Sequence, residues 1–110
     1  MKIAIRGYRE TKVVDQNEIV YCQADGRYIH IFLNDNSSIM TSRLLKTIEA
    51  LLSKSDFCRI HYSYLINVNY VTSIIDNTTL ILNHTIRLPI AKRRITALKK
   101  ILYNENIVAL

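Results

Sequence analysis

Apolar and polar residues alternate along much of this chain, and a period of two is typical of β-strands with one buried face. The clearest case is residues 28–33, where Ile29, Ile31 and Leu33 share one face of the predicted strand. Further strands are predicted at residues 2–6, 11–14, 19–24, 38–40, 64–67, 71–75, 80–82 and 85–88, and one ends at His61. The pattern therefore predicts a mainly β fold of about ten short strands.

Two segments have the period of an α-helix instead. The first lies mid-chain and has an apolar stripe made of Leu44, Leu45, Ile48, Leu51 and Leu52. Thr41 or Ser42 is expected to cap this helix, and residues 53–55 to end it. The second covers residues 91–103, with its basic side chains largely off the apolar side. We therefore expect one short amphipathic helix mid-chain and one C-terminal helix.

Local breaker residues set the turns between these elements. Gly26 is the residue expected to need positive φ in the turn before residue 28. Asn83 and His84 are expected to form a two-residue hairpin turn. Pro89 predicts an edge strand or a strand end because it lacks a backbone N–H. The tail, residues 104–110, is expected to fray.

Length and composition predict a single domain over residues 1–110, whose first 18 residues form an N-terminal β-hairpin region. Apolar residues make up 49% of the chain, but no run is long enough to span a bilayer, and residues 1–6 do not read as a signal peptide. We therefore expect a cytoplasmic protein with no membrane partner. Cys22 and Cys58 are expected to be reduced and buried, although the sequence leaves a disulfide between them open. The three histidines show no metal-ligand spacing, so neither a metal nor a cofactor is predicted.

The formal net charge is +6, and the basic excess lies entirely in the second part of the chain. Residues 1–40 hold five basic and five acidic side chains, whereas residues 41–110 hold ten basic and four acidic ones. Six basic residues fall between positions 87 and 100 with no acid among them. A one-sided basic surface is typical of nucleic-acid binders, although a solvated helix face is the alternative that this stretch leaves open.

One stretch combines side chains suited to contact with a phosphodiester backbone. Arg59 is a permanently charged fork of donors, and His61 and Ser63 are short donors. Tyr62 adds a flat face with a polar tip.

A second basic cluster, Lys92, Arg93 and Arg94, lies at the predicted start of the C-terminal helix. Helix N-termini attract phosphate through their free N–H groups, but cations there cost the helix up to about 0.3–1 kcal/mol each. A cluster placed against this preference suggests an anionic partner.

Four pieces of the sequence resemble, in the same order, elements of the LytTR domain, a family of DNA-binding output domains of bacterial LytR/AlgR-type response regulators. They are residues 19–24 with Gly26-Arg27-Tyr28, the helix with Leu44-Leu45 and Leu51-Leu52, the run Phe57-x-Arg59-x-His61-x-Ser63-Tyr64-Leu65-Ile66-Asn67, and Leu88-Pro89-Ile90-Ala91-Lys92-Arg93-Arg94. The match covers nearly the whole chain.

The resemblance implies an elongated antiparallel β fold whose loops insert into successive major grooves of double-stranded DNA. The implied contact regions are the turn at Arg27, the loop at residues 61–63 and the helix start at residues 92–94. Tyr62 and Ala91 depart from the family's usual residues, which affects sequence preference. The resemblance further implies transcriptional regulation within a two-component system, a receiver domain served by a histidine-kinase pathway, and a homodimer on promoter direct repeats.

The residues themselves leave other interpretations open. On the residues alone, an exposed turn residue is the favoured interpretation of Arg27, while His61 can be a structural histidine that bonds a backbone carbonyl and Arg94 a side chain whose stem packs on the core. An enzyme is disfavoured, because the His-x-Ser motif of some phosphoesterases occurs only once and no carboxylate pair or phosphate loop accompanies it. An RNA-binding or protein-interaction module is the remaining alternative, with tyrosines as stacking groups.

Overall fold

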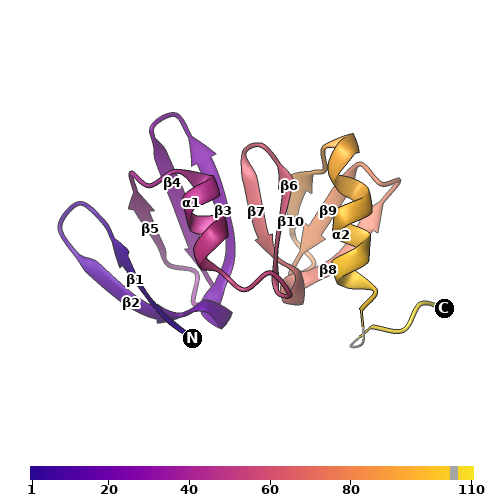
Figure 1. Cartoon of the computed structure of the whole chain (residues 1–110), viewed down its shortest axis with the longest axis horizontal. Helices are drawn as coiled ribbons and strands as arrows, with labels where there is room; N and C mark the ends of the chain where they lie inside the picture. Colours follow the sequence, from indigo (N-terminus) through magenta and orange to yellow (C-terminus); the bar gives the residue numbers. More distant parts are fainter. Residues whose placement is uncertain (105–106) are drawn as a thin grey trace.

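The computed structural model describes residues 1–104 and 107–110, in a body of 46 × 27 × 25 Å. Within these residues the chain forms ten strands in three antiparallel sheets, together with two α-helices (Figure 1). The sheets follow one another along the long axis in Figure 1, from the N-terminal hairpin to the C-terminal sheet. The predicted fold class, an elongated mainly β fold with one mid-chain and one C-terminal helix, is confirmed.

A five-stranded sheet forms the middle of the molecule. Its strand order is β5-β4-β3-β7-β6, and its strands are β3 (Ile19–Asp25), β4 (Tyr28–Leu33), β5 (Ser38–Thr41), β6 (Phe57–His61) and β7 (Tyr64–Asn67). The alternation in β4 has its expected effect, since Ile29, Ile31 and Leu33 are all buried. Gly26 joins β3 to β4 with φ of 60°, as predicted.

Different elements cover the two faces of this sheet, so the protein has two hydrophobic cores. The first core lies under helix α1 (Leu45–Leu51) and the hairpin of β1 (Lys2–Arg6) and β2 (Thr11–Asp15). The second lies under helix α2 (Ile95–Leu102) and the sheet of β8 (Val71–Ile75), β9 (Thr79–Leu82) and β10 (Ile86–Pro89). Neighbouring residues of β7 illustrate the division, because Leu65 packs in the first core and Ile66 in the second.

Three 3₁₀ turns complete the described part of the chain, at η1 (Gln16–Glu18), η2 (Val68–Tyr70) and η3 (Lys92–Arg94). The polar turn predicted around residue 15 is η1, where Asp15 and Glu18 form a capping box. Asn67 similarly caps η2, accepting the N–H of Asn69 on its side chain at 3.0 Å.

The turn between β9 and β10 differs from the predicted two-residue hairpin. Leu82 pairs with Ile86, so the loop has three residues. Asn83 and His84 both have positive φ, as a tight turn requires, and the N–H of Thr85 bonds to the carbonyl of Leu82 at 3.1 Å. Because that bond uses the Thr85 N–H to close the turn, strand pairing resumes one residue later.

The predicted cap of α1 is wrong. Leu44 occupies the N-cap position in an extended conformation, and no side chain of residues 1–104 or 107–110 accepts a hydrogen bond there. The hydroxyl of Thr41 lies one turn too early and accepts the N–H of Arg43 at 3.5 Å, while Ser42 also precedes the cap.

The apolar stripe of α1 is narrower than predicted. Leu44 and Leu51 are each 63% exposed, whereas the buried members are Leu45, Ile48 and Leu52. Leu44 is the extended N-cap residue and Leu51 is the last residue of this seven-residue helix, so the two exposed leucines lie at its ends.

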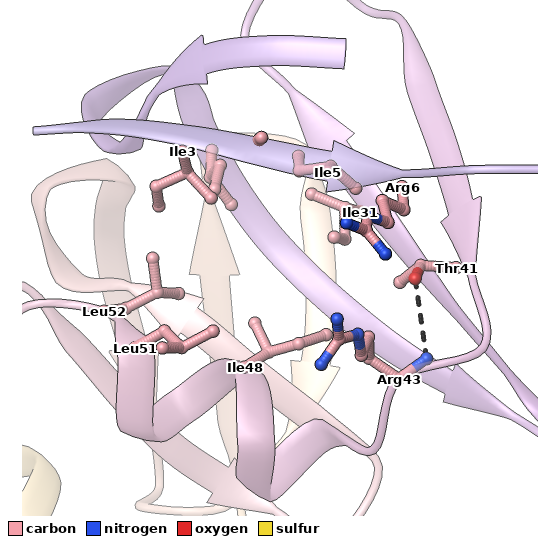
Figure 2. Close-up of a pocket in the computed structure, with 11 residues that line it drawn as sticks. Ile3, Ile5, Arg6, Ile31, Thr41, Arg43, Ile48, Leu51 and Leu52 are labelled. Carbon is pink, nitrogen blue, oxygen red and sulfur yellow. Dashed lines mark hydrogen bonds between the residues drawn. The ribbon is translucent and has the colours of Figure 1, made fainter. Parts of the chain in front are cut away.

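Leu51 instead lines an apolar groove between α1 and β1 (Figure 2). The groove has a cavity volume of about 290 Å³. Ile3 and Ile5 reach into it from β1, and Ile48, Leu51 and Leu52 from α1, with Arg6 and Arg43 toward one end (Figure 2).

The C-terminal helical segment begins with η3 and continues as α2, ending one residue before the predicted boundary at 103. Pro89 ends β10, which is an edge strand of its sheet, as predicted. Of the tail expected to fray, residues 105–106 lie outside the described residues.

Candidate nucleic-acid interface

Three loops lie at one edge of the molecule, the upper edge in Figure 1. They are the β3–β4 turn at residues 26–27, the β6–β7 loop at residues 62–63, and the segment from Ala91 through η3. We call these the edge loops. The sequence-predicted site residues Arg27, His61 and Lys92 belong to or adjoin one of them each, so segments far apart in the chain meet at one edge.

Backbone hydrogen bonds hold the edge loops together, with the β6–β7 loop in the middle. On one side, the Ala24 N–H donates to the Ser63 carbonyl at 2.8 Å. On the other side, the Ala91 N–H donates to the Ile60 carbonyl at 2.8 Å. That carbonyl is available because the β6–β7 pairing shifts register between Arg59 and His61. The relative placement of the three loops is therefore fixed by the backbone.

His61 and Ser63 close the middle loop. The Nδ1 atom of His61 accepts the Ser63 N–H at 3.1 Å. A ring whose Nδ1 accepts a hydrogen bond carries its proton on Nε2, so Nε2 remains as a donor. Tyr62 is 71% exposed at the tip, and its ring lies 4.9 Å from the His61 ring, centroid to centroid. The loop thus presents an imidazole donor and an aromatic ring. His61 also bonds to the backbone, but it accepts an N–H instead of donating to the carbonyl considered from the sequence.

Arg59, also a predicted contact, is turned inward. Its side chain is only 14% exposed, and its Nη1 lies 3.6 Å from the Oε1 of Glu49. Its Nε donates to the carbonyl of His61 at 2.9 Å, and its Nη2 donates to the carbonyl of Tyr62. The structure therefore places Arg59 beneath the β6–β7 loop and not among the exposed cations.

Arg27 follows Gly26 at the exposed tip of the β3–β4 turn. A Cβ at Gly26 would meet no atom within 4 Å, so the positive φ rather than space favours glycine there. Among the described residues, no ion pair includes Arg27. Its guanidinium is therefore free to reach an external acceptor.

The basic cluster of η3 divides in two. Lys92 and Arg93 are exposed and form no ion pair within the described residues. Arg94 is half-buried, and its Nε is a buried atom that lacks a hydrogen-bond partner within the same part of the chain. The packing role considered for Arg94 from the sequence fits this position.

The two thiols are buried and free, on opposite sides of the five-stranded sheet. Burial raises the pKa of Cys22 to about 12 and that of Cys58 to about 11. At neutral pH both are therefore protonated. In the described part of the chain, no cluster of three or more metal-ligating side chains occurs, and no helix is long and apolar enough to cross a membrane.

The model of the LytTr DNA-binding domain family matches residues 9–103. The chain belongs to the LytTR family of DNA-binding domains. The match includes all three edge loops and all eight sequence-predicted site residues, from Arg27 to Arg94.

This LytTR domain is similar to the sensory transduction protein LytT of Bacillus subtilis (strain 168), at 28% identity over 106 residues. It is also similar to the LytT of Oceanobacillus iheyensis, at 33% identity over 73 residues. Those matches cover 93% and 66% of the chain but only 44% and 30% of the relatives, so the chain spans less than half of their length. A solved LytTr DNA-binding domain from Bacillus cereus has the same fold, with a TM-score of 0.79 at 21% identity over 93% of this chain and 96% of that one.

Sequence reasoning missed Glu49 and the backbone of Ala24 and Ala91 as parts of this edge. Glu49 lies ten positions before Arg59, on another element, and no local spacing pairs the two. The two alanines act through their N–H groups, which every non-proline residue has, so their side chains give no signal.

Proposed function

We propose that the edge loops of this LytTR domain bind double-stranded DNA sequence-specifically and thereby regulate transcription. The observation that carries the proposal is the pair of backbone hydrogen bonds that fix Ala24, Ser63, Ile60 and Ala91 side by side. These bonds hold beside one another the three segments that carry an exposed guanidinium, an imidazole with an aromatic ring, and two exposed cations.

We assign the contacts by chemistry. Arg27 has an exposed guanidinium at the tip of a turn and can donate to both the O6 and N7 atoms of guanine in the major groove. Lys92 and Arg93 supply phosphate contacts, which position the protein and provide most of the affinity. His61 Nε2 donates to a phosphate or base acceptor, and Tyr62 packs its ring against a sugar or a thymine methyl group.

The rest of the proposal concerns the protein to which this domain would belong. We propose that it is the output domain of a cytoplasmic two-component response regulator, joined to a receiver domain and bound to promoter direct repeats as a homodimer. Head-to-tail repeats place successive copies in the same orientation, so binding to two repeats should depend on their spacing in helical turns.

Selection of bound duplexes from a random pool, followed by sequencing, tests the proposal. We expect a consensus sequence that binds with about 1,000-fold or more higher affinity than scrambled duplex, since the affinity for specific sites exceeds that for non-specific ones by at least that ratio. In the recovered site, Arg27→Ala should relax base preference at one position at a cost of about 1–3 kcal/mol. Equal affinity for selected and scrambled duplexes, or preference for single-stranded RNA in competition at fixed salt, would contradict the proposal.

A further inference from the structure

The β6–β7 loop lacks the backbone geometry that normally closes a two-residue hairpin. His61 pairs with Tyr64, leaving only Tyr62 and Ser63 between the strands. Such loops favour turns with positive φ, because those turns match the twist of the flanking strands. Neither Tyr62 nor Ser63 has positive φ. This hairpin therefore needs another source of stability.

Other turns of the chain show the contrast. In the two-residue hairpin between Asp25 and Tyr28, Gly26 has φ of 60°. Asp76 and Asn77, in the turn after β8, have φ of 52° and 58°. Asn83 and His84, in the turn after β9, have φ of 49° and 65°. The turns after β8 and β9 are closed by backbone hydrogen bonds from Thr78 and Thr85. Among the described residues, the side chains that donate to their carbonyls are the threonine hydroxyls, and no charged side chain does so.

Arg59 supplies such a contact for the β6–β7 loop. Its guanidinium donates to the carbonyls of His61 and Tyr62 at once, and Glu49 on α1 lies on its third side at 3.6 Å. Charge-assisted hydrogen bonds from a planar fork are stronger than neutral ones and fix direction as well as distance. The loop that carries His61 and Tyr62 is thus held from below by one side chain.

We propose that Arg59, oriented by Glu49, is a positioning residue that holds the β6–β7 loop in its DNA-binding conformation and does not itself contact DNA. The inference rests on the proposed function, and it assigns to Arg59 a role different from the contact expected from the sequence. A side chain that is 14% exposed and already donates to two carbonyls has little capacity left for an external phosphate.

Two substitutions at one position separate a positioning role from a contact. Arg59→Lys keeps the charge but loses the planar fork, and Arg59→Gln removes the charge. For a positioning residue, both should weaken binding to the selected duplex by roughly tenfold, about the effect of losing one charge-assisted hydrogen bond. Binding to scrambled duplex and the dependence of log K on log salt should match those of the wild type.

A phosphate contact predicts the opposite pattern. Arg59→Lys would then bind almost normally, and Arg59→Gln would flatten the salt slope by about 0.9 and weaken selected and scrambled duplexes alike. That pattern would overturn the proposal. Arg9→Lys is the matched control, because Arg9 is exposed in the β1–β2 loop, belongs to none of the edge loops and should change neither measurement.

Glu49→Gln provides an independent variant that changes no predicted contact. It should weaken only the selected duplex, by a smaller factor than Arg59→Lys, whereas Glu10→Gln in the exposed β1–β2 loop should have no effect. Selected-duplex affinity that is unchanged in Glu49→Gln would remove Glu49 from the proposal.

Hydrogen exchange of the Ser63 amide, measured without DNA, tests the same idea apart from binding. That amide is protected by the Nδ1 of His61 within the loop, so it should exchange faster in Arg59→Lys and Glu49→Gln while amides of β4 stay as protected as in the wild type. Unchanged Ser63 exchange would overturn the positioning role even if the wild-type protein proved not to discriminate DNA sequences. Failure of the proposed function alone would leave this exchange difference intact.

Discussion

Neutralising Lys92 and Arg93 should weaken DNA binding while leaving the fold as stable as before, or slightly more stable. Both side chains are exposed in η3, and within the described residues neither forms an ion pair. They stand before α2, where the positive end of the helix dipole disfavours cations by about 0.3–1 kcal/mol each at low salt. Removing them as Lys92→Gln and Arg93→Gln therefore relieves a local repulsion and deletes two phosphate contacts.

The size of the binding effect follows from the number of contacts. Two lost contacts should make the slope of log K against log salt shallower by about 1.8. When salt is raised from about 50 to 200 mM, the factor by which the affinity falls should therefore be roughly twelve times smaller for the variant than for the wild type. Arg94 is left out of this count because it is half-buried in the structure.

Fluorescence anisotropy of a labelled duplex across that salt range, on selected and scrambled sequences, measures the slope. Thermal unfolding of the same samples without DNA measures stability. An unchanged slope would place both cations outside the interface. A marked loss of stability would show that they hold the fold, and the reasoning from the helix dipole would then be refuted.

Three further predictions concern the scaffold. Gly7→Ala should lower the free energy of unfolding by about 1–3 kcal/mol in urea, because a Cβ would lie 3.0 Å from the Cδ1 of buried Ile39. An unaltered urea midpoint would mean that the Ile39 side chain shifts to make room for the added methyl group. Asn67→Ala should cost about 1–3 kcal/mol in the same assay, since this buried side chain donates to one backbone carbonyl and accepts one backbone N–H, and a smaller loss would point to water taking over both bonds. Burial raises the pKa of Cys22 to about 12 and that of Cys58 to about 11, so the unfolded chain releases these protons at lower pH than the folded chain does. The stability that the two protonated thiols contribute should therefore be fully present below about pH 9 and fall as pH rises to about 11. Unfolding midpoints that stay level over this range, relative to a chain with both thiols replaced by alanine, would argue against it.

Much of this fold could be predicted because its strands are specified by local pattern. The alternation at residues 28–33 decides which face of β4 is buried, and Gly26 decides where the chain turns before it. The ends of β4, β7 and β8 fall at the predicted residues. Each of these features depends on side chains that are close in sequence, so the sequence reports them directly.

The misjudged features depend on contacts between distant segments. Leu51 fits the spacing of the stripe but lines the groove between α1 and β1, and Leu44 precedes the helix as its extended N-cap residue, so both are exposed. The orientation of Arg59 depends on Glu49, and the position of η3 depends on the bond between Ala91 and Ile60. The types of residue at the candidate site were predictable, whereas the division between exposed and inward-turned cations required the structure.

Helix α1 takes part in two sites that are otherwise separate. Ile48 and Leu52 line the groove beside β1, and Glu49 between them reaches Arg59 beneath the β6–β7 loop. Because Glu49 lies on the same short helix as these lining residues, a molecule that entered the groove and displaced α1 would also displace the carboxylate of Glu49. Inhibitors of this domain could therefore be sought at a largely apolar groove that is separate from the edge loops.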